Sequence, residues 1–259
     1  MALSANYNFI VELARQHCPA PARLLDFGCG AGEVVLEALR HGYDAWGVDT
    51  FDAGWQHFAD PATANLGQRL RRIAAGEPLS FDDAWFDVIV SNQVFEHIAD
   101  ITPVASELAR VLRPGGKLIA IFPTIEVIIE PHVMAPVVHW LPLRSRAQRM
   151  MLLLSRRVGL ANAPMTAADD EWIHAATHVL GQMIFYRRAG DVAGTFAPWF
   201  RLIDRAEPAW LCDRMRRSGL KTLAALLGNS AFAGVLRWLC LRLANGVFVL
   251  ERNHTHVVG

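Results

Sequence analysis

The sequence has no excess of charge of either sign. Its 259 residues include 25 Lys and Arg and 25 Asp and Glu, so the formal net charge is zero. A neutral chain has no overall field that would attract the phosphate backbone of nucleic acid. We therefore expect no sequence-independent binding of DNA or RNA.

Cysteine is also scarce. The four cysteines form no CxxC pair, and none has a histidine at the spacing of zinc ligands. These spacings argue against a disulfide framework and against a zinc site. From these spacings we expect no bound metal. The four are Cys18, Cys29, Cys212 and Cys240.

Long uninterrupted apolar runs are absent too. No window reaches the roughly 18 residues that a membrane-spanning helix needs, and residues 118–141 and 220–250 come nearest. The N-terminus lacks the basic segment of a signal peptide and has the periodicity of an amphipathic helix. We expect a cytoplasmic protein. Residues 220–250 either form a core helix or lie on a membrane surface. The arginine-rich stretch 144–157 is either a solvated helix face or a site for lipid phosphate.

Apolar residues make up 53% of the chain, which is enough for a sizeable core. In the first half they form short runs separated by stretches of helical periodicity, typical of buried strands that alternate with helices. This alternation indicates an α/β fold with a parallel sheet and right-handed crossovers. We predict strands over residues 22–27, 43–49, 86–91 and 117–122, and weaker ones over 199–204 and 246–251.

The alternation stops after residue 123. The next 75 or so residues contain several prolines but no strand–helix pattern, so they are interpreted as a mostly helical insertion. The predicted organisation is a cofactor-binding core over 1–123, a helical cap over 124–198, the rest of the core sheet over 199–252, and a tail over 253–259.

Three glycines mark the turn after the first predicted strand. Gly28, Gly30 and Gly32 allow positive φ and close approach of a ligand to the backbone. Asp49, about twenty residues on at a strand end, has the position of a carboxylate that binds ribose hydroxyls. The glycine spacing differs from the G-x-G-x-x-G of nicotinamide sites. Asp26 would repel a pyrophosphate but not the ammonium and sulfonium groups of S-adenosylmethionine.

Two further segments carry a family resemblance. Residues 79–98, LSFDDAWFDVIVSNQVFEHI, resemble the LPFPDxSFDVVxSxxVLEH stretch of class I S-adenosylmethionine-dependent methyltransferases. Residues 108–118, LARVLRPGGKL, resemble their RVLKPGGxL element. With the glycine motif, the resemblance spans residues 22–122 and is to the type-11 family. It implies a Rossmann-like seven-stranded sheet of order 3-2-1-4-5-7-6 with an insertion after the fifth strand.

The resemblance also implies which residues bind S-adenosylmethionine. The glycine turn holds the methionine end, Asp49 the ribose, and residues near 50 and 80 the adenine. The residue where relatives carry an adenine-binding Asp is Ala75, and Glu77 is the nearest carboxylate. The expected cofactor-binding residues are Asp26, Gly28, Cys29, Gly30, Gly32, Asp49, Thr50, Phe51, Glu77, Leu79, Ser80, Asn92 and Gln93.

Histidines are the candidate bases, because their pKa lies nearest neutrality. His97 follows the fourth predicted strand and His132 the fifth; packing roles remain open for both. The EPH and WLP segments around His132 resemble an element of methyltransferases found among bacterial polysaccharide genes, which implies a sugar or glycan hydroxyl as acceptor. Methylation at nitrogen or carbon, and a non-catalytic binding protein, remain alternatives. His174 and His178 share a helix face, without an evident third metal ligand.

Overall fold

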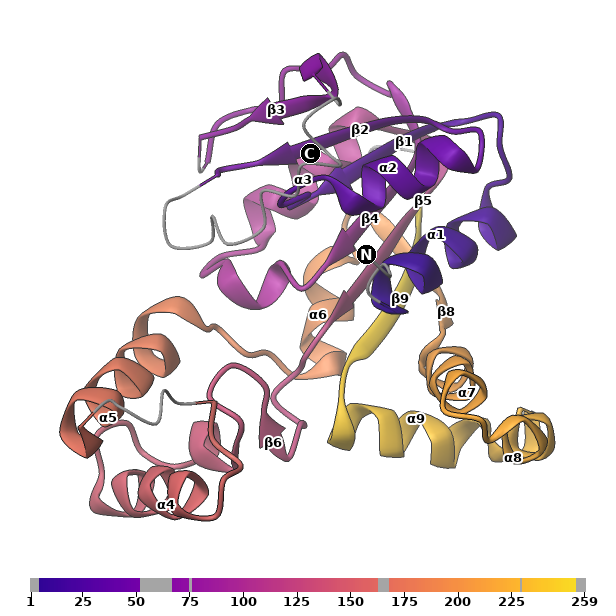
Figure 1. Cartoon of the computed structure of the whole chain (residues 1–259). Helices are drawn as coiled ribbons and strands as arrows, with labels where there is room; N and C mark the ends of the chain where they lie inside the picture. Colours follow the sequence, from indigo (N-terminus) through magenta and orange to yellow (C-terminus); the bar gives the residue numbers. More distant parts are fainter. Residues whose placement is uncertain (1–4, 52–66, 75, 163–167, 229, 255–259) are drawn as a thin grey trace.

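A computed structural model describes residues 5–51, 67–74, 76–162, 168–228 and 230–254. Its centre is a seven-stranded sheet in the order β3-β2-β1-β4-β5-β9-β8, which confirms the order implied by the family resemblance (Figure 1). The strands are β1 (Arg23–Phe27), β2 (Asp44–Asp49), β3 (Leu70–Arg72), β4 (Phe86–Asn92), β5 (Leu112–Phe122), β8 (Phe200–Arg205) and β9 (Gly246–Arg252).

The first five strands are parallel, and β9 runs antiparallel between β5 and β8. The carboxyl ends of β1, β2 and β4 therefore meet at one edge of the sheet, where parallel α/β sheets bind ligands. Because successive side chains of a strand point to opposite faces, Leu24 and Leu25 of β1 enter different cores.

Helices cover both faces of the sheet. The helices α1 (Ala5–His17), α2 (Glu33–Arg40), α7 (Glu207–Arg217) and α9 (Ala233–Leu243) contribute side chains to the core on Leu24's side. On the other face lie α3 (Thr102–Val111) and α6 (Ala189–Phe196). The amphipathic helix expected at the N-terminus is thus α1, and it buries Ile10 and Leu13.

Between β5 and α6 the chain leaves the sheet and forms a cap with a hydrophobic cluster of its own (Figure 1). The cap contains a small hairpin of β6 (Ile129–Glu130) and β7 (Ala135–Pro136), followed by α4 (Arg146–Arg157) and α5 (Asp169–His178). Val133, Leu152 and Trp172 lie in its cluster.

The predicted boundary of the cap at residue 198 differs from the structure. Helix α6 lies inside the predicted segment but packs in the core of the sheet, with the Phe196 ring 5.5 Å from that of Phe95. The cap therefore ends before α6. Its two ends meet, because Ile125 N donates a 3.0 Å hydrogen bond to Arg187 O.

The apolar stretch predicted over 220–250 folds as α8 (Lys221–Leu227), α9 and β9. No described helix is long and apolar enough to span a bilayer. Ala75 and the last five residues of the predicted tail lie outside the described residues.

Candidate functional site

The glycine turn after β1 is anchored to the end of β2. Gly28 N and Cys29 N donate hydrogen bonds of 2.8 and 3.0 Å to Val48 O. Gly30 N donates to Asp49 Oδ2 at 2.8 Å. The predicted glycine and Asp49 residues thus form one unit at the carboxyl edge of the sheet.

The glycines of this turn all have left-handed backbone geometry, with φ of +79° at Gly28, +50° at Gly30 and +88° at Gly32. A Cβ built on Gly28 would lie 2.2 Å from Val94 Cγ2, whereas one built on Gly30 meets nothing within 4 Å. Gly32 precedes α2, whose start has no side-chain cap. The turn therefore offers open space at Gly30 beside uncapped helix N–H groups, which favour a carboxylate.

Acidic side chains lie close together beside this turn. Asp26 is 2% exposed, and its pKa is raised well above its ordinary value by burial, then by Asp49 and Glu33. Tyr7 of α1 lies near the same charges, since burial, Glu33 and Asp26 raise its pKa. Such a concentration of carboxylates attracts a cationic ligand and disfavours an anionic one.

The Asp49 carboxylate accepts hydrogen bonds from two backbone segments, the glycine turn and the residues that follow β2. Its Oδ2 binds Gly30 N, and its Oδ1 accepts from Phe51 N at 3.0 Å. A carboxylate has about four lone-pair positions, so both oxygens can accept further bonds from ribose hydroxyls. Thr50 and Phe51 follow directly; Arg72 donates to Thr50 O at 2.5 Å, and its guanidinium lies 5.6 Å from the centroid of the Phe51 ring.

The expected adenine-bordering residues lie on a segment held by α3 and β3. Leu79 N donates to Glu107 Oε1 at 2.6 Å, and Arg71 donates to Ser80 O at 2.7 Å. Leu79 is buried, whereas Glu77 is exposed. The structure therefore fixes the position of Leu79 and Ser80 but places Glu77 on the surface.

The two expected residues at the end of β4 differ in their partners. Asn92 Oδ1 is buried and has no hydrogen-bond partner within the described residues. Gln93 has φ of +60°, and its Nε2 donates to Asn245 Oδ1 at 2.9 Å. Asn92 therefore has an acceptor to offer a ligand, whereas the Gln93 side chain is engaged with the loop before β9.

His132 is held by a buried carboxylate on the hairpin of the cap. Its Nδ1 lies 2.6 Å from Oε1 of Glu130, which is fully buried and also accepts from Tyr186 Oη at 2.5 Å. Burial raises the pKa of Glu130, but hydrogen bonds from His132, Tyr186 and Val133 N outweigh it and lower the pKa. Because an ionised carboxylate only accepts, Nδ1 carries the proton and Nε2 has the basic lone pair.

His97 lies next to His132 but belongs to the sheet domain. It ends the short 3-10 helix η3 (Phe95–His97) after β4, and the centroid of its ring lies 5.1 Å from that of His132. Its Nδ1 lies 2.9 Å from Met183 O, so the proton is again on Nδ1. Burial lowers the pKa of His97, which favours the neutral imidazole. The structure thus brings the two candidate bases together.

Four residues that sequence reasoning did not assign contribute to these sites. Glu96 is 1% exposed, and burial raises its pKa to about 8. Glu130 and Tyr186 position His132, and Tyr7 adjoins the acidic turn. Glu130 stood in the EPH segment, but Tyr186 is 54 positions from His132 and had no local signal.

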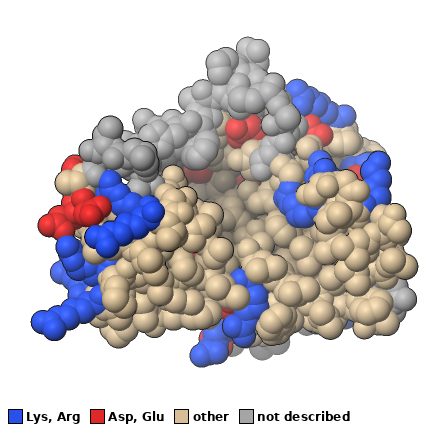
Figure 2. Space-filling view, turned by 60° about the horizontal axis from the view of Figure 1, so that its bottom comes forward, with Lys and Arg blue, Asp and Glu red and all other residues tan. Residues whose placement is uncertain are grey.

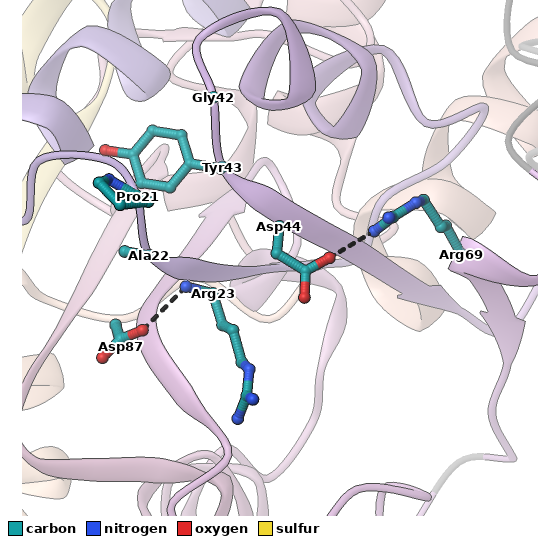
Figure 3. Close-up of a pocket in the computed structure, with 8 residues that line it drawn as sticks. All are labelled: Pro21, Ala22, Arg23, Gly42, Tyr43, Asp44, Arg69 and Asp87. Carbon is teal, nitrogen blue, oxygen red and sulfur yellow. Dashed lines mark hydrogen bonds and ion pairs between the residues drawn. The ribbon is translucent and has the colours of Figure 1, made fainter.

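A shallow pocket lies at the opposite edge of the sheet, at the amino ends of β1 and β2 (Figure 3). There Asp44 pairs with Arg69, and Asp87 accepts a hydrogen bond from Arg23 N. Ligands of parallel α/β sheets bind at the carboxyl edge instead, so this pocket is not the candidate site.

The remaining sequence candidates lie on the surface. His174 and His178 are both exposed on α5. On α9, Val235, Trp238 and Leu243 are 58%, 57% and 63% exposed. The space-filling view shows a recess between the cap on the left and the lobe of α7–α9 on the right (Figure 2).

Comparison with known proteins agrees with this geometry. Residues 25–120 match the family described as "Methyltransferase domain". This part of the chain is a methyltransferase domain of the type-11 family. Its match covers β1 to β5 and stops where the cap begins.

Curated relatives resemble this methyltransferase domain rather than the whole chain. The sterol 4-C-methyltransferase of Caenorhabditis elegans is 35% identical over 98 residues, which are 37% of this chain and 29% of that protein. The ubiquinone biosynthesis O-methyltransferase of Sinorhizobium medicae is 33% identical over 99 residues, 37% of this chain and 39% of its own length. The chain therefore spans less than half of these relatives.

A solved structure extends the likeness of the fold. The S-adenosylmethionine-dependent methyltransferase of Mesorhizobium loti superposes with a TM-score of 0.59 at 14% identity, covering 96% of this chain and 98% of that one. At this identity the likeness confirms the Rossmann-like fold of the methyltransferase.

Proposed function

We propose that the chain binds S-adenosylmethionine at the Gly28–Gly32 turn and transfers its methyl group to a small acceptor. The observation that carries the proposal is the hydrogen bond between Gly30 N and Asp49 Oδ2, which joins the glycine turn to a ribose-type carboxylate. The open space at Gly30 and the buried acid Asp26 fit a ligand with an amino-acid end and a net positive charge.

Asn92 and the uncapped start of α2 support the same cofactor. The unpartnered Oδ1 of Asn92 can accept from the ammonium group, and the first N–H groups of α2 can bind the carboxylate. When bound, the cofactor supplies an electrophilic methyl group on a sulfonium. The protein then has to hold the acceptor in line with the methyl–sulfur bond and exclude water.

The acceptor in this proposal is a hydroxyl, and His132 takes its proton. The acceptor oxygen forms a bond to the methyl carbon as the carbon–sulfur bond breaks, and the hydroxyl proton moves to His132 Nε2. Glu130 holds the imidazole in the required tautomer and stabilises the imidazolium. His97 packs edge-on against His132.

A sugar or glycan is the acceptor class that the cap supports best. Ring contacts run from His132 through Tyr186 and His139 to Trp140, with centroids 5.2 to 6.4 Å apart. Trp140 is 43% exposed, which leaves an aromatic face for stacking on a sugar ring. Both sequence relatives named above act on other acceptors, a sterol carbon and a ubiquinone precursor.

Calorimetry and labelling test this function in order. Titration with S-adenosylmethionine should give one site per chain, and NAD should give none. Protein supplied with methyl-labelled cofactor and a cell extract should then label a product, whose identification gives the acceptor atom. Binding of NAD without S-adenosylmethionine would overturn the cofactor assignment. Cofactor binding without any labelled product would favour the non-catalytic alternative.

We also propose that α8 and α9 contact a membrane surface. Their exposed apolar side chains lie beside Arg242, whose guanidinium is 5.7 Å from the centroid of the Trp238 ring and suits anionic lipid. The lobe that carries them borders the recess next to the cap (Figure 2). Such contact would bring a lipid-linked acceptor to this recess.

A further inference from the structure

Three potential metal ligands gather where the hairpin of the cap meets the segment that follows β4. One ligand atom each from Glu96, His97 and His132 can be chosen so that all lie within 4.8 Å of one another. Two come from η3, directly after β4, and the third from the hairpin of the cap. Residues 35 positions apart in the chain are therefore brought to one point.

The burial of the Glu96 carboxyl group is not offset by hydrogen bonds to its oxygens from other described residues. It is 1% exposed, and neither of its oxygens has a hydrogen-bond partner within the described residues. Its nearest basic atom is His97 Nε2, 3.9 Å from Oε1. An unpartnered buried carboxyl group is costly, and buried charges are usually paired or coordinate a metal. A bound cation would offset this cost.

Both imidazoles are oriented as ligands usually are. Metal-binding histidines donate their other N–H to a carboxylate or a backbone carbonyl. His132 Nδ1 does so to Glu130, and His97 Nδ1 to Met183 O, at 2.6 and 2.9 Å. In both rings the lone pair is consequently on Nε2.

We propose that Glu96, His97 and His132 bind a divalent transition-metal ion, of which Zn²⁺ is the first candidate. Two imidazoles and one carboxylate form a ligand set known for Zn²⁺ and for Fe²⁺, with positions open for substrate. In a tetrahedral site, metal–ligand bonds of about 2.0–2.2 Å place ligand atoms about 3.3–3.6 Å apart. The three ligand atoms now lie within 4.8 Å of one another, so side-chain movements of about 1 Å would close the site around an ion.

The ion would replace His132 as the group that activates the acceptor hydroxyl, and this role rests on the proposed binding of S-adenosylmethionine and a hydroxyl acceptor. Val94, two positions before Glu96, fills the space above Gly28, so the metal ligands adjoin the cofactor turn. An ion here would bind the acceptor oxygen and lower the pKa of its hydroxyl, with the proton released to solvent. It would occupy Nε2 of His132, so coordination and proton transfer to His132 exclude each other.

Metal binding can be measured without cofactor or acceptor. Protein stripped with a chelator should bind one Co²⁺ or Zn²⁺ per chain, followed by visible absorption of Co²⁺ and by elemental analysis. Because His174 and His178 are exposed and four positions apart on α5, all variants carry His178→Ala to remove that surface pair. Glu96→Gln, His97→Ala and His132→Ala should each weaken binding at least about tenfold, or roughly 1.4 kcal/mol.

His41→Ala is the control, since this histidine lies at the end of α2, where it pairs with Glu37, and is outside the cluster. It should bind metal like the parent. Absence of stoichiometric binding, or affinity unchanged in all three ligand variants, would overturn the site. Failure of the proposed function is separate: bound metal without methyl transfer leaves the site standing. If chelated protein turns over at the full rate, the catalytic role of the ion is wrong and His132 acts as base.

Discussion

Val94 occupies the space that any side chain at Gly28 would require, with its Cγ2 2.2 Å from the built Cβ position. Gly28 belongs to the glycine turn, and Val94 begins the segment that carries Glu96 and His97. The absence of one methyl group thus lets the proposed cofactor site and the proposed acceptor site touch. The two sites are expected to respond together when this contact is changed.

Gly28→Ala and Gly30→Ala should therefore have different effects. Both positions have positive φ, which costs an alanine roughly 1–2 kcal/mol. Only Gly28→Ala also collides with Val94, so it should lower the melting temperature more than Gly30→Ala does. Gly30→Ala should keep most of the stability and lose cofactor affinity. Equal melting temperatures in thermal unfolding would show that the contact with Val94 is not tight.

Asp49→Ala should weaken S-adenosylmethionine binding at least about tenfold, or roughly 1.4 kcal/mol. The variant loses the ribose acceptor and releases Gly30 N and Phe51 N from their shared carboxylate. Asp44→Ala, at the other end of the same strand, is the control and should retain affinity, because Asp44 pairs with Arg69 at the opposite edge of the sheet. Calorimetry of both variants checks the cofactor assignment, which unchanged affinity in Asp49→Ala would refute.

In metal-free protein His132→Ala should lower turnover by roughly 10²- to 10⁴-fold, the range for a general base. Cofactor affinity should stay within a factor of two or so of the parent, because His132 lies on the cap. Tyr186→Phe keeps the ring and removes one hydrogen bond to Glu130, so it should cost less. Rate measurements with a hydroxyl acceptor distinguish these cases. Full turnover in His132→Ala would exclude it as the base.

Acid stability should depend on Glu251 of β9. Hydrogen bonds from Lys117 at 2.7 Å and Arg201 at 2.6 Å lower its pKa from 4.5 to about 2. A depressed folded-state pKa stabilises the fold above the ordinary value, and that stabilisation is lost as pH falls from about 4.5 to about 2. Glu251→Gln should thus be less stable than the parent at pH 7. Denaturant unfolding should show the difference shrinking to nothing near pH 2.

Trp238→Ala with Val235→Ala should reduce binding to vesicles that contain phosphatidylserine. The two side chains are exposed on α9 and account for much of the apolar surface there. Co-sedimentation with anionic vesicles measures the effect, and pure phosphatidylcholine should retain less of the parent protein because Arg242 favours anionic headgroups. Equal recovery of parent and variant would remove the membrane surface from the proposal.

The sheet was predictable where apolar runs were strong. Strands β1, β2 and β4 were located within one residue at each end, since buried parallel strands have short, nearly continuous apolar runs, whereas β5 begins at Leu112, before its predicted start at residue 117. Strand β3 left no such pattern, because Leu70–Arg72 is a three-residue edge strand with two arginines. The residues of the glycine turn were found because their spacing is local.

The second site was only partly predictable. His97 and His132 were each named as bases, but nothing in the sequence places them together, because the contact depends on how the cap folds back. Glu96 stands in the VFEH part of the family motif, but its burial was not foreseen, since burial of a carboxylate is a tertiary property. The expectation of no metal came from the cysteines and from His174 and His178, and did not consider this contact. The position of α6 was assigned to the cap because its periodicity does not reveal which core it joins.

The cap leaves and rejoins the sheet domain at one place, where Ile125 N binds Arg187 O. Any segment that begins and ends at those two neighbouring points can be exchanged without altering the distance between β5 and α6. The cap can therefore be replaced as a unit. A library of caps grafted between residues 125 and 187 would vary acceptor choice while the cofactor turn keeps its geometry.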